Sequence, residues 1–268
     1  MNIWRSLRGL SQVWADDDGF RKAGRPMGWY VFTHYAARWR DRKGQQHPWQ
    51  MVKFKVRHHT QSYRLTSEHL GAALGVLVDE EYAAVGRFEG KVSRVLDLGG
   101  NVGMGSGYLS TFFPHAEFAV VEPDPRNLAV LSDNLARNGI VSRIFGAAIG
   151  SSAGMMSLRV GDNPACSSLQ GVELHEMSGA VDVSVMTVPD VMRVMGWQSI
   201  DLVKMDIEGA EKDVLSINNQ WLNHVGALIL EVHPNTTPDF IQAQLAPFSL
   251  KMKRVGTGRE PVFLAVRN

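Results

Sequence analysis

The chain has 268 residues, of which 44% are hydrophobic, and this is enough to bury one sizeable core together with an appendage. The formal net charge is +1, so the overall charge favours no class of partner. A single cysteine, Cys166, excludes an internal disulfide. The sequence has no apolar run of about eighteen residues and no apolar leader, so it predicts a cytoplasmic protein without a spanning helix.

The charge is unevenly distributed along the chain. Residues 1–64 carry 13 Lys/Arg against 4 Asp/Glu, and they hold five of the seven tryptophans. This stretch predicts either a solvated segment whose aromatic side chains dock on the main domain, or a contact with an anionic membrane surface, a glycolipid or a substrate. We therefore divide the chain into a basic, Trp-rich extension (1–60), a helical lead-in (61–92) and a main domain (93–268).

The predicted elements follow one another in a regular order. The lead-in predicts one helix over residues 67–85, because Leu70, Leu74 and Leu77 recur near the helical period. In the main domain, short apolar runs that predict strands alternate with amphipathic runs that predict helices. The predicted strands are 92–98, 118–121, 144–149, 155–160, 181–188, 200–207, 227–232, 250–255 and 262–266. The predicted helices are 105–113, 124–138, one that begins near 209, and 238–245.

This order of elements predicts an α/β fold. Strands that alternate with helices form a doubly wound, mostly parallel sheet with helices on both faces. The connection between the last two strands is too short for a crossover, so they form a hairpin that adds an antiparallel strand. In the helix over 124–138, Asp124 is placed to cap the first turn and Gly139 to end the last one.

The carboxyl ends of the first two strands carry the residues that we expect to bind a ligand. The first strand ends at Asp97 and continues into a glycine-rich turn, where the backbone can approach a ligand closely. Asp97 can meet a cationic amine, and Glu122, at the end of the second strand, can accept hydrogen bonds from both hydroxyls of a ribose. The cofactor-binding residues predicted in this region are Asp97, Gly99, Asn101, Gly103, Glu122, Pro123 and Ala148.

The spacing of the glycines excludes two other kinds of nucleotide site. G-x-G-x-x-G does not occur in any frame, and neither does the phosphate-binding pattern G-x-x-x-x-G-K-[ST]. The expected ligand therefore has a ribose and a cationic amine but no pyrophosphate. S-adenosylmethionine fits that description.

Several sequence blocks resemble one family of methyltransferases. VLDLGGNVG (95–103) and VVEPDPRN (120–127) resemble the cofactor loop and the ribose-binding strand end of class I enzymes. KMDIEGAE (204–211) resembles the most distinctive block of the FkbM-type family, and LILEVHP (228–234) resembles its fifth strand. SSL (167–169) falls where that family has a serine-bearing loop. The chain is similar to FkbM-type methyltransferases over about residues 60–266.

The resemblance implies a Rossmann-like sheet of seven strands with the final hairpin strand inserted antiparallel. It also implies S-adenosylmethionine as the methyl donor and O-methylation of a sugar or a natural product. The expected acceptor is therefore a small molecule or a carbohydrate, including the carbohydrate of a glycolipid.

The ends of the fourth and fifth strands carry the candidate catalytic residues. Methyl transfer to a hydroxyl requires alignment of donor and acceptor, exclusion of water and removal of the acceptor's proton. Asp206 is the first candidate for the general base, with a hydrogen-bond clamp on its turn as the alternative role. His233 is a second candidate, because an unshifted histidine titrates near neutrality. Glu208 is the third, although an acidic group in the first turn of a helix also interacts favourably with the helix dipole.

Three further residues are candidates for contact with the acceptor. Ser167 and Ser168 lie in a loop of small polar residues, and Glu231 ends the fifth strand. Glu231 can also orient His233. With Asp206 it can hold a divalent cation through oxygen ligands, but the sequence shows no tight ligand cluster, so metal dependence is not favoured.

Two other functions are kept as alternatives. A nucleic-acid methyltransferase that acts on amino groups commonly has an Asn/Asp-Pro-Pro-aromatic turn after the fourth strand, where this chain has Asp-Ile-Glu-Gly (206–209). Nucleic acid is therefore a disfavoured partner. The one feature in its favour is the basic N-terminal stretch. A non-catalytic protein that binds S-adenosylmethionine would keep Asp97 and Glu122 but tolerate the loss of Asp206 and His233.

Overall fold

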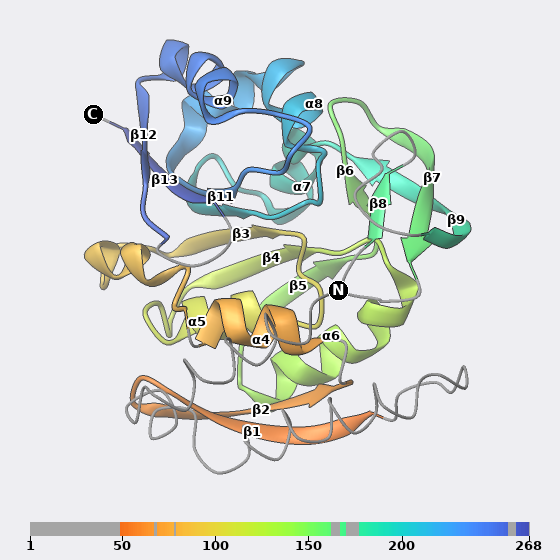
Figure 1. The fold of residues 1–268 in the computed structure, drawn as a ribbon. Helices are drawn as coiled ribbons and strands as arrows, with labels where there is room; N and C mark the ends of the chain where they lie inside the picture. The colour runs from red at the N-terminus through yellow and green to blue at the C-terminus, as the bar shows by residue number, and fades with distance from the viewer. Residues whose placement is uncertain are drawn as a thin grey trace, which may run out of the picture.

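The computed structural model describes residues 49–66, 69–77, 79–161, 167–169, 177–256 and 261–267. Residues 1–48, which hold most of the basic, Trp-rich extension, lie outside the described residues, as does the expected contact of that segment with an anionic surface. The described chain forms one seven-stranded sheet flanked by helices, a four-stranded sheet beside it and a two-stranded hairpin below it (Figure 1).

The large sheet has the predicted doubly wound order. Its strands are β3 (Arg94–Leu98), β4 (Glu117–Val121), β5 (Ser142–Phe145), β10 (Ile200–Met205), β11 (Val225–Glu231), β12 (Leu250–Arg254) and β13 (Val262–Arg267). They are arranged in the order β12-β13-β11-β10-β3-β4-β5. β13 lies between β11 and β12 and is antiparallel to both, whereas all other neighbours are parallel. The predicted Rossmann-like sheet with an antiparallel hairpin strand is therefore confirmed.

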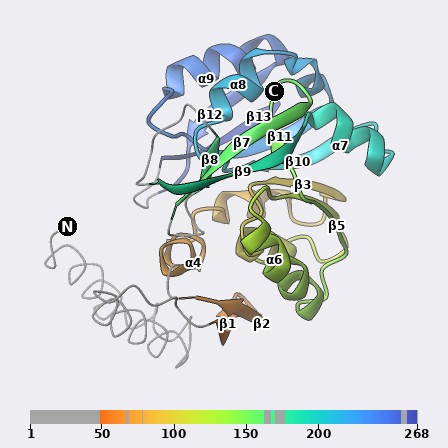
Figure 2. The ribbon, with the colours of Figure 1, turned by 90° about the vertical axis from the view of Figure 1, so that its right-hand side faces the viewer.

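Helices cover both faces of this sheet (Figure 2). On one side lie α4 (Leu70–Leu77), α5 (Met104–Ser110) and α6 (Pro125–Arg137), and on the other lie α7 (Val188–Met195), α8 (Glu211–Ser216) and α9 (Pro238–Leu245). Short 3-10 turns occur at η3 (Ala83–Phe88), η4 (Asn219–His224) and η5 (Ala246–Phe248). Among the described helices, none has the length and apolar character needed to cross a membrane.

The strands bury both of their faces, because alternate side chains enter two separate cores. In β3, Val95 belongs to the cluster on the side of α4, α5 and α6, and Leu96 belongs to the cluster on the opposite side. This explains why the strands read as continuous apolar runs. In α6, Asp124 accepts a hydrogen bond from the Arg126 amide at 2.8 Å, and Gly139 has φ +67 just after the helix, as the capping signals predict.

The hairpin of β1 (Gln50–Val56) and β2 (His59–Leu65) is a feature that the sequence analysis did not foresee. Its inward side chains Phe54, Tyr63 and Leu65 are buried in the same core as α6. The Asn134 side chain of α6 accepts a hydrogen bond from the Arg64 amide at 2.7 Å and donates to the Arg64 carbonyl at 3.2 Å. The residue-60 boundary of our division thus falls within a hairpin that packs on the main domain.

The helix expected over residues 67–85 was too long. α4 ends at Leu77, and a turn separates it from η3. Glu80 has φ +48, a conformation that a helix does not allow, and the Glu81 amide donates back to the Gly75 carbonyl at 3.2 Å. The apolar residues between 67 and 85 are periodic because side chains before and after this turn are buried, and not because the segment is one continuous helix.

The second sheet contains β6 (Ala148–Ile149), β7 (Gly154–Gly161), β8 (Ser167–Leu169) and β9 (Met177–Met186), in the order β6-β9-β7-β8. The run over 144–149, expected as one strand, is divided between β5 in the large sheet and β6 in this one. Because β6 continues from β5, the second sheet stands beside the carboxyl ends of the large sheet's strands (Figure 1).

Candidate active site

The turn after β3 is packed directly against the turn after β10. The Asp206 amide donates to the Leu98 carbonyl at 3.0 Å, which holds the two turns together. Gly99 has φ +83, and a Cβ placed on it would lie 1.7 Å from the Asp206 carbonyl oxygen. Only glycine fits at this position. The sequence predicts that Gly99 lies close to a ligand, and the structure shows in addition that it lies close to the protein's own backbone at Asp206.

Glu122 is held in one orientation after the end of β4. Its carboxylate accepts hydrogen bonds from the Asn101 amide at 2.8 Å, the Asp124 amide at 2.9 Å and the Asn127 side-chain amide at 3.2 Å. Burial raises the pKa of Glu122 to about 7, although these hydrogen bonds act in the opposite direction. The structure therefore places a preorganised carboxyl group beside the glycine-rich turn.

A pocket opens at the carboxyl ends of β3, β4 and β10. It has a volume of about 620 Å³, its open mouth included. Its lining includes five of the predicted cofactor-binding residues and two of the predicted catalytic residues. It is lined by Gly99, Asn101, Val121, Glu122, Pro123, Asn127, Ala147, Ala148, Ile149, Leu158, Asp206, Ile207, Glu208 and Ala210. Asp97 and Gly103 are not part of this lining, and Gly103 instead occupies the N-cap of α5.

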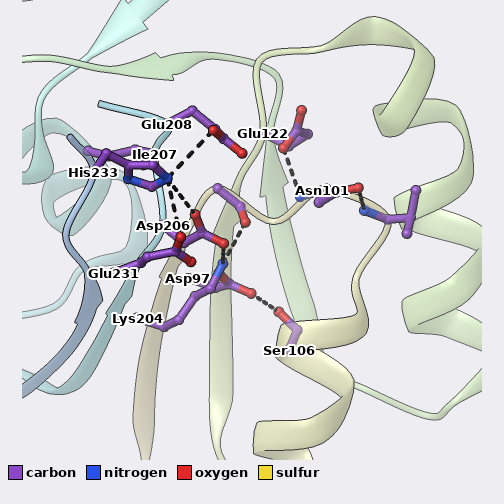
Figure 3. A network of polar contacts seen from close by, with 12 residues as sticks. Asp97, Asn101, Ser106, Glu122, Lys204, Asp206, Ile207, Glu208, Glu231 and His233 are labelled. Atoms are coloured by element: carbon purple, nitrogen blue, oxygen red, sulfur yellow. Dashed lines mark hydrogen bonds and ion pairs between the residues drawn. The ribbon is translucent and has the colours of Figure 1, made fainter. Parts of the chain in front are cut away.

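Asp97 has a cationic partner within the protein. The Lys204 ammonium lies 3.1 Å from one Asp97 oxygen, and the Ser106 hydroxyl donates to the other at 2.6 Å (Figure 3). Lys204 also donates to the Gly99 carbonyl at 2.7 Å. Burial lowers the pKa of Lys204, but the charges of Asp97 and Asp206 outweigh it and raise this pKa above its ordinary value. The predicted contact of Asp97 with a ligand amine stays a prediction, since Lys204 already meets this carboxylate.

His233 is surrounded by carboxylates from three segments of the chain. Its Nδ1 lies 2.9 Å from Glu211 Oε1. Its Nε2 lies 3.5 Å from Glu208, 3.5 Å from Glu231 and 3.9 Å from Asp206 (Figure 3). The sequence-predicted residues Asp206, Glu208, Glu231 and His233 are thus brought together, and Glu211 joins them.

The carboxylates change what His233 can do. Burial lowers its pKa, but the hydrogen bond with Glu211 and the charges of Glu211, Asp206 and Glu208 raise the pKa to about 10. An imidazole that already carries its proton cannot accept another one. Asp206, the other of the two first candidates, lines the pocket, and its role as the general base stays a prediction.

Glu81 is a carboxyl group that the sequence analysis missed. It lies in the turn between α4 and η3, and burial together with the charge of Asp206 raises its pKa to about 7. No motif marks it, because its position beside Asp206 depends on how the lead-in folds against the sheet. The adjacent Tyr82 is buried, and Lys204 lies 5.8 Å from the centre of its ring.

Ser167 and Ser168 belong to β8, whose backbone pairs with Val160 and Arg159 of β7. Most of the loop in which they were expected, 162–166 and 170–176, lies outside the described residues. Their contact with an acceptor stays a prediction.

Comparisons with known proteins show which family the chain belongs to. Residues 97–254 match the family model described as the methyltransferase FkbM domain. The chain is 33% identical over 151 residues to the methyltransferase sdnD of Sordaria araneosa, an alignment that covers 45% of this chain and 58% of that protein. It is 29% identical over 142 residues to the 2-O-methyltransferase NoeI of Sinorhizobium fredii, covering 48% of this chain and 58% of that protein.

The chain therefore spans a little over half the length of these curated relatives. The family match extends from Asp97 at the end of β3 to Arg254 at the end of β12. It includes the glycine-rich turn, Glu122 and the carboxylate cluster around His233. Because the matched region makes up more than half of the sequence, this chain belongs to the FkbM methyltransferase domain family.

Proposed function

We propose that this protein is an S-adenosylmethionine-dependent O-methyltransferase that acts on a hydroxyl group of a sugar, a glycolipid or a natural product. The observation that carries the proposal is the pocket itself, which is lined by the buried carboxyl of Glu122 and by the carboxylates of Asp206 and Glu208. A donor and an acceptor can be bound side by side there. Membership of the FkbM family supports transfer to oxygen, as does the similarity to NoeI, which is named a 2-O-methyltransferase.

The donor side of the pocket fits an adenosyl group. Glu122 Oε2 accepts one hydrogen bond, from Asn101, and a carboxylate oxygen can accept two, so it can accept another from a ribose hydroxyl. Ala148 provides an apolar wall. When bound, the donor supplies an electrophilic methyl group on a sulfonium centre.

The acceptor side provides groups that can remove a proton from a hydroxyl. Asp206 lines the pocket directly after β10, and the Lys204 ammonium lies 3.7 Å from its Oδ2. A carboxylate that is fixed in this way is a suitable general base once the acceptor hydroxyl lies within hydrogen-bond reach. Glu208 lines the same part of the pocket. It lies in the turn before α8, where its backbone has a positive φ of +51.

The affinity for S-adenosylmethionine is expected to rise as the pH increases from about 6 to about 8, because Glu122 ionises in this range with a pKa of about 7. The ionised carboxylate accepts ribose hydroxyls better than the protonated group does. Isothermal titration calorimetry at several pH values measures the effect. Glu122→Gln should bind the donor more weakly and lose the dependence on pH.

The stability of the protein should depend on the ionisation of Glu122 in the opposite direction to donor affinity. Its folded-state pKa of about 7 lies above the ordinary 4.5. The contribution of Glu122 to stability is therefore fully present below pH 4.5 and is lost as the pH rises through about 7. If donor affinity and stability changed with pH in the same direction, Glu122 would not be the group responsible.

A nucleic-acid substrate is not supported by the site. The turn after β10 reads Asp-Ile-Glu-Gly, and the carboxylates of Glu122, Asp206 and Glu208 line the pocket. A negative pocket repels phosphates. Retention on heparin with a steep dependence on salt would favour the nucleic-acid alternative.

The test of the proposed function is transfer of a labelled methyl group from S-adenosylmethionine to an extract of cell metabolites and glycolipids, followed by mass spectrometry. We expect the label in a methyl ether on one class of small molecule or glycolipid. Recovery of the label on nitrogen or in RNA would contradict O-methylation. Donor binding without transfer to any acceptor would favour the non-catalytic alternative.

A further inference from the structure

The carboxylates that face His233 Nε2 lie farther from it than a usual hydrogen bond. Three oxygens surround Nε2, at 3.5 Å (Glu208), 3.5 Å (Glu231) and 3.9 Å (Asp206). All three distances exceed the usual 2.7–3.2 Å of an N–H···O hydrogen bond. On the opposite side of the same ring, Nδ1 and Glu211 are 2.9 Å apart. The three oxygens therefore share Nε2 as ion pairs, and none of the three forms a close hydrogen bond with it.

The same spacing can also accommodate a metal ion. One ligand atom each from Asp206, Glu208 and His233 can be chosen so that all lie within 4.8 Å of one another. For metal–ligand distances of about 2.1 Å, neighbouring ligands of an octahedral ion are roughly 3 Å apart and opposite ligands roughly 4 Å apart. The Nε2 distances to the surrounding carboxylates fall in this interval, so these side chains can reach one central ion with little movement.

Glu211 gives independent support, because it orients the imidazole from behind. It is fully buried, and its Oε1 lies 2.9 Å from His233 Nδ1, so a cation bound at Nε2 would replace the proton that this nitrogen carries in the metal-free protein. Metal-bound histidines almost always have their second nitrogen on such a carboxylate or carbonyl partner. Within the described residues, Glu211 Oε2 has no hydrogen-bond partner, and a nearby cation would compensate this buried charge.

We propose that Asp206, Glu208 and His233 bind one divalent cation, with Glu231 beside them as a further oxygen donor. Oxygen ligands favour Mg²⁺ or Mn²⁺, and the imidazole shifts the preference toward Mn²⁺. The inference rests on the proposed function for its role. Asp206 and Glu208 both line the pocket, so the cation would lie next to the acceptor hydroxyl and stabilise its oxygen as the proton leaves.

The experiment is a titration of chelator-treated, full-length protein with Mn²⁺, in which electron paramagnetic resonance measures the free ion. We expect one binding site per chain in the micromolar range. Spin-echo modulation of the bound Mn²⁺ should show coupling to an imidazole nitrogen. Asp206→Asn and Glu208→Gln should each weaken binding at least tenfold.

Asp133→Asn is the matched control, because Asp133 lies on the exposed surface of α6 in an ion pair with Arg137. It should bind Mn²⁺ like the wild type. Circular dichroism of each variant establishes that it is folded, and Glu208→Gln keeps the test valid if Asp206→Asn fails to fold. Failure to bind Mn²⁺ at millimolar concentration, or equal binding by the cluster variants and the control, would overturn the proposal.

Calorimetry with S-adenosylmethionine on metal-free protein separates this inference from the proposed function. Donor binding and methyl transfer without Mn²⁺ binding would remove the metal site and leave the methyltransferase proposal intact. Specific Mn²⁺ binding by a protein that neither binds the donor nor transfers methyl would support the metal site and contradict the methyltransferase proposal.

Discussion

Asp206→Asn is expected to lower kcat for methyl transfer at least about 100-fold, with little change in the Kd for S-adenosylmethionine. Asp206 lines the pocket directly after β10, 3.9 Å from His233 and 3.7 Å from Lys204. Asparagine keeps the shape of the side chain but removes its capacity to accept a proton and most of its affinity for a cation. Initial rates at saturating donor, combined with calorimetry, measure the two quantities separately.

Asp201→Asn is the control for this variant, because Asp201 is at the opposite end of the same strand. There it accepts hydrogen bonds from the Ser93 and Arg94 amides, far from the pocket lining. We expect its turnover to match that of the wild type. If Asp206→Asn also kept full turnover, the acceptor side would have to be sought elsewhere. A loss of donor affinity equal to the loss of kcat would instead indicate that the turn had collapsed.

Lys204→Met is expected to destabilise the protein by about 3–5 kcal/mol, because it leaves a buried carboxylate without its cation. Asp97 is completely buried, and Lys204 is 3% exposed. The variant also removes the hydrogen bond to the Gly99 carbonyl. Urea unfolding, followed by two independent probes, gives the change in the free energy of unfolding.

Asp97→Asn in the same chain should recover a substantial part of that loss, since it removes the uncompensated charge. Arg137→Ala breaks the exposed Arg137–Asp133 pair on α6 and serves as the comparison, with an expected cost below about 1 kcal/mol. If the double variant were no more stable than Lys204→Met, charge compensation would not be the main role of Lys204.

The sequence predicted those parts of the fold that depend on local signals. The helix at α6 has its cap at Asp124, and α9 begins and ends where its pattern predicts. The hairpin of β1 and β2 was missed because its stability comes from packing on α6. The division of the run over 144–149 into β5 and β6 also depends on tertiary structure, since the two strands join different sheets.

The same distinction applies to the site. Glu122, Asp206 and Glu208 could be placed from the rule that ligands bind at the carboxyl ends of parallel strands, and they line one pocket. The pairing of Lys204 with Asp97 could not be predicted from the sequence. It depends on the register between β10 and β3, which sets these two residues side by side. The contact of Glu211 with His233 depends on the packing of α8 against the end of β11.

The position of Lys204 has a consequence for how the pocket responds to its ligands. Its ammonium group joins the carbonyl of Gly99, on the donor side, to the carboxylate of Asp206, on the acceptor side. A shift of either turn would therefore disturb the contact that Lys204 makes with the other turn. We therefore expect occupancy of one half of the pocket to affect the affinity of the other half, and such coupling is reciprocal.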